Sequence, residues 1–84
     1  MEKQLSDVSN KEVMSFYKKI GENVKEARIS ANISQLDLAL AIGIKSVAFY
    51  SNCESVRYNK HFNLEHIYKI SKVLNISISS LIEG

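Results

Sequence analysis

Residues 34–54 read SQLDLALAIGIKSVAFYSNCE, and the fold depends on this stretch. Ser34 suits a helix N-cap, because its hydroxyl can accept a hydrogen bond from a free amide of the first turn. Asp37 then lies near the positive end of the helix dipole, where a carboxylate is favourable. The apolar residues that follow at helical spacing are Leu38, Ala39 and Ile42. They predict a helix of about two turns, which needs tertiary packing to hold it.

A tight turn follows this helix. Gly43 stands where glycine often ends a helix, and Ser46 is the natural N-cap of a second short helix. Two short helices joined by a glycine turn are typical of the helix-turn-helix arrangement. One such helix fits the major groove of B-DNA while its partner braces it across the backbone, so the stretch indicates DNA binding.

The second short helix has two possible registers. With Phe49 as the central core residue, Asn52 lies on the buried face; with Tyr50 at the centre, Cys53 does. A buried amide without a partner costs about 1–3 kcal/mol, whereas a thiol buries readily. We therefore expect Tyr50 and Cys53 to face the core, and Ser51 and Asn52 to face outward together.

The chain before this stretch predicts one long helix. Ser9, followed three residues later by Glu12, matches a capping box. Steps of three and four then mark one buried face, which consists of Val13, Phe16, Tyr17, Ile20, Val24, Ala27 and Ala31. Gly21 lies inside this helix at a cost of about 1 kcal/mol relative to alanine, so we expect a neighbour to approach closely there. Residues 1–8 are expected to form a flexible tail, and residues 9–84 a single domain.

The chain after this stretch predicts a loop and two further helices. Residues 55–63 interleave basic and aromatic side chains, and we expect Tyr58 and Phe62 to hold this loop against the core. Asn63 and Ser77 can cap the last two helices. The expected apolar face of the first is Leu64, Ile67, Tyr68, Ser71 and Leu74, and the second carries Ile78, Leu81 and Ile82. The last three side chains would either cover the core or form a dimer seam.

Composition agrees with a small all-helical domain. The chain has 84 residues, of which 45% are hydrophobic, with no proline and three glycines. One modest core fits this length, and strand-rich domains usually need more turn residues. Cys53 is the single cysteine, which excludes an internal disulfide, and His61 and His66 do not complete a zinc set. We expect no metal and no cofactor.

Several functional classes receive no support from the sequence. Residues 1–7 contain no apolar run, and no stretch approaches the roughly 20 apolar residues of a membrane span, so we expect a cytoplasmic protein. The sequence has no nucleophile–base set and no phosphate-binding glycine loop, so we expect neither an enzyme nor a small-molecule ligand. The formal net charge of +2 permits nucleic-acid binding without demonstrating it.

A set of short motifs occurs in a fixed order along the chain: Ile20–Arg28, Ser34-Gln35, Leu38-Ala39, Ile42–Ile44, Glu54 and Leu74–Ile78. In this order they resemble the phage-repressor and Cro-like (XRE) helix-turn-helix family, over about Phe16 to Ile82. The resemblance implies a compact five-helix, repressor-like domain, here with an N-terminally extended first helix. It implies that the helix after Gly43 enters the major groove. It also implies a structural ion pair between Arg28 and Glu54.

Three features depart from the family pattern. The turn from Gly43 to Ser46 is one residue longer than usual. The loop after Glu54 is longer and lacks the usual glycine and proline. The residues that would face the groove include no arginine, lysine or glutamine. Aligning Ser46 with the cap of the family nevertheless places Tyr50 and Cys53 at core positions, in agreement with the burial argument.

The predicted function is sequence-specific binding of double-stranded DNA by a transcriptional regulator, a repressor that acts as a homodimer on a palindromic operator. The expected base contacts are Val47, Ala48, Ser51 and Asn52. The expected phosphate contacts are Gln35, Lys45, Ser46, Arg57 and Lys60. The alternative is a protein-interaction module of the same fold. It would use Leu36 and Leu40, which we otherwise expect to pack on the helical turns around residues 5–14.

Overall fold

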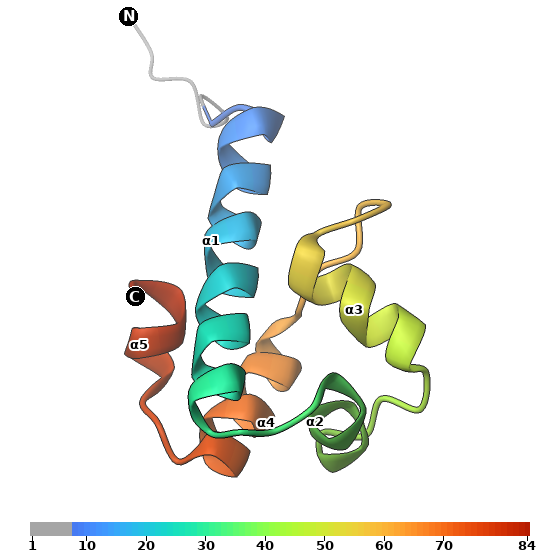
Figure 1. The fold of residues 1–84 in the computed structure, drawn as a ribbon. Coiled ribbons are helices and arrows are strands. Elements are labelled where there is room, and N and C mark those ends of the chain that lie inside the picture. Colours follow the sequence, from blue (N-terminus) through green and yellow to red (C-terminus); the bar gives the residue numbers. More distant parts are fainter. Residues whose placement is uncertain (1–7) are drawn as a thin grey trace, which may run out of the picture.

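The computed structural model describes residues 8–84, and this part of the chain consists of five helices without any strand (Figure 1). The helices are α1 (Asn10–Ser30), α2 (Gln35–Ala41), α3 (Val47–Ser55), α4 (Leu64–Leu74) and α5 (Ile78–Ile82). The predicted all-α class and the long first helix are confirmed. Of the predicted tail, residues 1–8, all but Val8 lie outside the described residues.

Every helix begins after the side chain that the sequence predicts as its cap. The caps are Ser9, Ser34, Ser46, Asn63 and Ser77. Each side-chain oxygen accepts a hydrogen bond from the backbone N–H three residues later, at 2.8–3.2 Å. Such a cap satisfies one of the amides that a first helical turn leaves without a partner. Interactions within four residues of sequence therefore specify where each helix starts.

The helices surround α1. In Figure 1, α3 packs on one side of α1 and α5 on the other, and α2 lies near the C-terminal end of α1, where it contacts α3 and α4. The largest fully buried side chains are Tyr50, Leu38, Ile70, Leu81, Val24 and Cys53. All five helices contribute to this core, which is how helices as short as α2 and α5 gain the packing that isolated helices of their length lack.

Gly21 lies where α1 meets α3. A Cβ atom at this position would overlap the backbone carbonyl oxygen of Glu54 and would stand 3.1 Å from the carbonyl carbon. The missing side chain is what allows the two backbones to come this close. The close approach predicted at Gly21 is therefore confirmed.

The register of α3 is the one that burial costs favour. Tyr50 and Cys53 are both 0% exposed, whereas Ser51 and Asn52 are only partly buried. Phe49 packs against the edge of the core. The preference for burying the thiol instead of the amide is confirmed.

Four residues that the helical spacing assigned to buried faces are exposed: Phe16, Ala31, Leu64 and Tyr68. Phe16 is 49% exposed, because it borders an open cleft with Leu64 and Ile67 of α4 instead of packing into the core. Leu64 is 81% exposed because α4 turns a neighbouring face to the core. The buried residues of α4 are Ile67, Ile70 and Ser71. Spacing alone does not separate two adjacent apolar faces of one helix.

Two further expectations are wrong. Tyr58 does not hold the loop to the core, because its side chain is 76% exposed, whereas Phe62 is buried as expected. Leu36 and Leu40 are 49% and 56% exposed. They do not pack on the described N-terminal turns, residues 8–14, because those turns lie at the end of the molecule away from α2 (Figure 1).

Candidate DNA-binding surface

A buried carboxylate joins the first three helices. Glu54, at the end of α3, is 6% exposed. Arg28 of α1 donates to it twice, from Nε to Oε2 at 3.0 Å and from Nη2 to Oε1 at 3.2 Å. Tyr50 donates its hydroxyl to Oε2 at 2.8 Å, and Gln35 of α2 donates Nε2 to Oε1 at 2.9 Å. The ion pair of Arg28 and Glu54 thus holds α3 on α1, and the hydrogen bond from Gln35 adds α2 to the same network.

The hydrogen bonds keep this buried pair charged. Burial by itself would raise the pKa of Glu54, but the hydrogen bonds from Arg28, Gln35 and Tyr50 outweigh it and lower the pKa. The hydrogen bond to Glu54 raises the pKa of Arg28. Burial, and then the hydrogen bond to Glu54, raises the pKa of Tyr50. A carboxylate that accepts four hydrogen bonds from three side chains is suited to holding structure.

The amide group of Gln35 uses one of its hydrogens in this network. One of its two amide hydrogens points to Glu54, and the residue is partly buried. The second hydrogen is not used by any hydrogen bond among the described residues. The expected phosphate contact of Gln35 would therefore use that second hydrogen, together with the free amides of the first turn of α2.

The turn between α2 and α3 accommodates the one extra residue between Gly43 and Ser46. Gly43 adopts φ +86°, a conformation that favours glycine. Ile44 then donates its backbone N–H to Ala39 at 2.8 Å and buries its side chain. Lys45 follows and is exposed. The chain thus reaches the cap of α3 at Ser46, whose oxygen accepts from the Phe49 amide at 3.1 Å.

The outward side of α3 gathers the four residues predicted to contact bases. Val47 is 41% exposed, Ala48 is exposed, and Ser51 and Asn52 are partly buried. None of them carries a charge. The surface can offer methyl groups, one hydroxyl and one amide, and the amide is the group able to donate and accept at the same time.

The loop that follows α3 carries the cations. Val56, Tyr58 and Asn59 all have positive φ, between +53° and +60°. The Arg57 amide donates to the Asn52 carbonyl at 2.8 Å, and the Lys60 amide donates to the Arg57 carbonyl at 3.0 Å. The side chains of Arg57 and Lys60 are exposed. Both cations therefore lie in one short loop joined directly to the C-terminal end of α3.

Two lysines near Gln35 were not singled out by sequence reasoning. A cleft of about 250 Å³ beside Gln35 is lined by Lys18, Glu22 and Lys25 of α1 and by Glu54 and Ser55 of α3. Their spacing of seven residues places the two lysines on one helix face, which was readable from sequence. The sequence does not predict which neighbour that face contacts, because this depends on how α1 and α3 cross.

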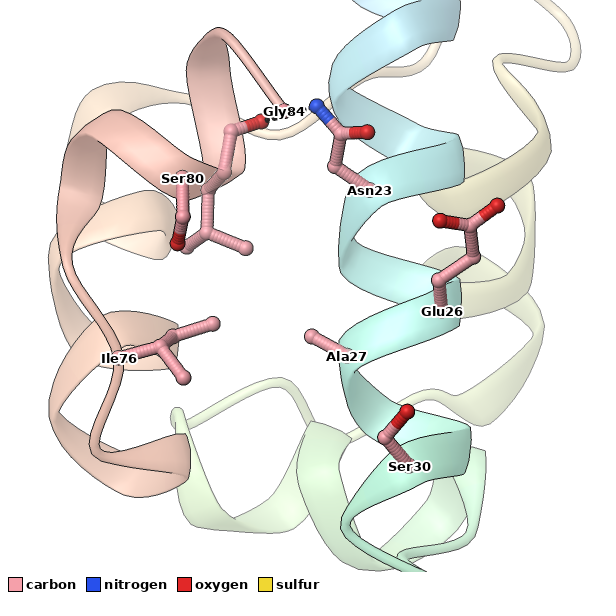
Figure 2. Close-up of a pocket in the computed structure, with 8 residues that line it drawn as sticks. Asn23, Glu26, Ala27, Ser30, Ile76, Ser80 and Gly84 are labelled. Atoms are coloured by element: carbon pink, nitrogen blue, oxygen red, sulfur yellow. Dashed lines mark hydrogen bonds between the residues drawn. The ribbon is translucent and has the colours of Figure 1, made fainter.

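Another cleft, of about 240 Å³, lies between α1 and α5 (Figure 2). Asn23 lies at one end of it and donates Nδ2 to the Leu81 carbonyl at 2.8 Å, which ties the two helices together. Glu26 is the one titratable side chain among its lining residues. Packing of α5 on α1 accounts for these contacts, and α2 and α3 take no part in them.

Comparison with protein-family models matches residues 24–81 to a helix-turn-helix family. No curated protein and no solved structure matches the chain. Within the described residues, no helix is long and apolar enough to cross a membrane. The match runs from the middle of α1 into α5 and leaves the first turns of α1 outside it. The chain therefore belongs to the XRE-type helix-turn-helix family of DNA-binding regulators.

Proposed function

We propose that this protein is a sequence-specific transcriptional repressor that reads the major groove of double-stranded DNA with α3. The observation that carries the proposal is the division of α3 into two sides. Tyr50 and Cys53 are fully buried, whereas Val47 and Ala48 are exposed at the N-terminal end of the helix. An α-helix presented in this way fits the major groove, with its first residues nearest the base edges.

Base reading would come from one amide and a few methyl groups. The Asn52 side chain can donate an amide N–H to N7 of adenine and accept a hydrogen bond from the N6 amino group, which is the usual bidentate contact of asparagine. Val47 and Ala48 can contact the methyl group of thymine, and Ser51 can donate to or accept from either kind of base pair. The proposed site therefore favours A·T pairs, because none of these side chains gives the usual bidentate contact to guanine.

Phosphate binding would supply most of the affinity. Lys45 precedes α3, while Arg57 and Lys60 follow it, and all three are exposed. Ser46 uses its oxygen as a cap but keeps its own hydrogen for a phosphate oxygen. Gln35 offers its second amide hydrogen at the start of α2. The outward side of α3 is uncharged and has cations before and after it. This arrangement matches a protein whose position is set by phosphate contacts and whose specificity is set by base contacts.

We further propose that the repressor binds as a homodimer to a palindromic operator, with half-sites about one helical turn apart. Of the three apolar residues near the end of the chain, Leu81 is 1% exposed and covers the core, while Ile78 stays 40% exposed. Ile78 is therefore the residue of this group that is available to a dimer seam. Sedimentation with and without operator duplex measures the stoichiometry.

Selection of binding sites from random duplexes tests the proposal directly. We expect one palindromic motif to be enriched. Asn52→Ala should then lose about 1–3 kcal/mol of discrimination at one base pair in each half-site. The matched control is Asn10→Ala, which removes an exposed amide at the start of α1 and should keep the motif unchanged. The absence of any enriched motif, or an unchanged motif with Asn52→Ala, contradicts the proposed reading role.

One observation favours a second candidate function, a protein-interaction module. Leu36 and Leu40 lie one turn apart on α2 and are about half exposed. A single exposed apolar side chain needs no explanation, but two adjacent ones are typical of a protein-binding surface. Equal, weak binding to all duplexes would support this candidate. This candidate function also requires a protein partner. Binding of that partner should be lost when Leu36→Ser and Leu40→Ser are combined, and retained with Val73→Ser, a control on α4 that is 40% exposed.

A further inference from the structure

An aromatic stack joins the start of α1 to the loop after α3. The ring of Tyr17 lies on the ring of His61, with the centroids 3.6 Å apart and the planes 10° from parallel. Tyr17 belongs to the part of α1 that precedes the family match at residue 24. His61 directly follows Lys60, one of the two cations of the loop. We propose that Tyr17 is a positioning residue, which holds residues 56–63 in the conformation that contacts DNA phosphates.

The loop needs support from outside itself. Val56, Tyr58 and Asn59 all have positive φ, and none of them is glycine. Such conformations cost free energy and persist where the surroundings enforce them. Within the loop, the backbone hydrogen bonds involve the amides of Val56, Arg57 and Lys60. The part of the loop nearest α1 therefore depends on side-chain contacts.

Side chains anchor the loop at both of its ends. Val56 is 9% exposed at the beginning of the loop, and Phe62 is 3% exposed at its end, where its ring lies 5.3 Å from the ring of Tyr50. Between these two anchors, the ring of His61 stacks on Tyr17 of α1, and Asn59 and His61 also border a cleft with Asn10 and Met14 of α1. Loss of the stack removes a direct aromatic contact that holds this segment in its strained conformation.

The stack also transmits its position to both cations. Lys60 is the neighbour of His61 in the chain, and its amide donates to the carbonyl of Arg57 at 3.0 Å. A shift of His61 therefore moves Lys60 first and Arg57 with it. Tyr17 itself lies on α1 and is not among the residues proposed to contact DNA. This inference rests on the proposed function, because it concerns the phosphate contacts of that same surface.

The test measures how steeply DNA binding depends on salt, using the duplex obtained by selection. The measured quantity is the ratio of Kd at about 200 mM salt to Kd at about 50 mM salt. Each phosphate contact contributes a factor of about 3.5 to this ratio, because the salt concentration changes about fourfold and enters with a power of about 0.9. Loss of one contact therefore lowers the ratio by that factor. We expect this reduction for Tyr17→Leu. Tyr17→Phe, which keeps the stack, should behave like the wild type. Tyr68→Leu is the matched control, since Tyr68 is an aromatic residue of α4 that is 53% exposed and takes no part in the stack.

A spectroscopic readout separates positioning from general stability. The ring protons of His61 lie over the Tyr17 ring, so their NMR signals should move downfield in Tyr17→Leu and stay in place in Tyr17→Phe. His61→Leu removes the stack from the other side and should reproduce the weaker salt dependence. It keeps the inference testable if Tyr17→Leu does not fold. The measurements are made on variants whose circular dichroism shows them fully folded.

Variants of the cations distinguish the failure of this inference from the failure of the proposed function. If Arg57→Ala and Lys60→Ala leave the salt dependence unchanged, the proposed phosphate contacts are wrong. If they weaken it while Tyr17→Leu and His61→Leu do not, the positioning role is overturned. Adding Tyr17→Leu to a protein that already carries Arg57→Ala and Lys60→Ala should not weaken the salt dependence further. A further reduction in that background would show that Tyr17 acts independently of both cations, which also overturns the inference.

Discussion

Replacing Gly21 by alanine should destabilise this protein strongly, although alanine is the better helix former. Gly21 lies in the middle of α1, where the change to alanine would normally stabilise a helix by about 1 kcal/mol. Here the added methyl group meets backbone. It would overlap the carbonyl oxygen of Glu54, stand 3.1 Å from the carbonyl carbon, and lie 3.5 Å from the carbonyl oxygen of Cys53.

The magnitude follows from what must move. No side-chain rotation relieves an overlap with backbone, so α1 and α3 must separate. A gap of 0.5–1 Å forfeits roughly a quarter to a half of each dispersion contact along the seam. It also stretches the two hydrogen bonds between Arg28 and Glu54. We expect the separation of α1 and α3 to cost about 4 kcal/mol, which is above the usual ~1–3 kcal/mol for overpacking. The gain in helix propensity offsets about 1 kcal/mol of this cost, so the net destabilisation is about 3 kcal/mol.

Thermal unfolding followed by circular dichroism measures this directly. For a domain of this size, a net loss of about 3 kcal/mol lowers Tm by roughly 12–24 °C. Ser15→Ala is the matched control, because Ser15 lies exposed on the same helix and its change should stay within about 0.5 kcal/mol. A Gly21→Ala protein whose Tm lies within about 2 °C of the wild type, or above it, would refute the close approach of the two backbones.

Three further predictions concern titratable groups. Glu54→Gln should lower the free energy of unfolding by about 3–5 kcal/mol near pH 7, since it leaves the buried Arg28 without an anion. The pKa of Glu54 in the folded protein lies below its ordinary 4.5, so the wild type loses the stability contributed by this carboxylate as pH falls from 4.5 through the folded pKa. Urea unfolding of Glu54→Gln should not show this loss. Burial lowers the pKa of His66 from 6.5, so the unfolded chain binds the proton more readily and stability should fall as pH drops below 6.5. His66→Gln, which keeps an acceptor for the Asn63 amide, should remove this part of the dependence, and an unchanged profile would count against it. Burial raises the pKa of the Cys53 thiol to about 11, so iodoacetamide at about pH 8 should label the native protein about 100-fold more slowly than the unfolded chain; equal rates would mean an accessible thiol.

Much of the candidate site was predictable because it depends on local sequence. The Ser46 cap fixed the start of α3, and the unequal costs of burying Asn52 and Cys53 selected its register. Once the register was known, the outward side of the helix followed from helical geometry. The loop cations Arg57 and Lys60 were visible as exposed charges next to it.

Other parts of the site depend on contacts that no local pattern contains. Periodicity could not decide whether Leu64 or its neighbours in α4 would face the core, because both choices satisfy helical spacing. It gave no sign that Tyr58 would be exposed, since residues with positive φ turned its part of the loop outward. Nor could it join Tyr17 to His61.

The sequence by itself determined where the five helices begin and which side of α3 is polar, because caps and helical periodicity act over three or four residues. Only the tertiary structure decided how Gln35, Arg28 and Glu54 share one buried network, whose ion pair joins residues 26 positions apart. The same holds for which apolar side chains remain exposed. Such contacts depend on the angle and distance at which whole helices pack, and these are set by the combined shape of the core rather than by any single segment.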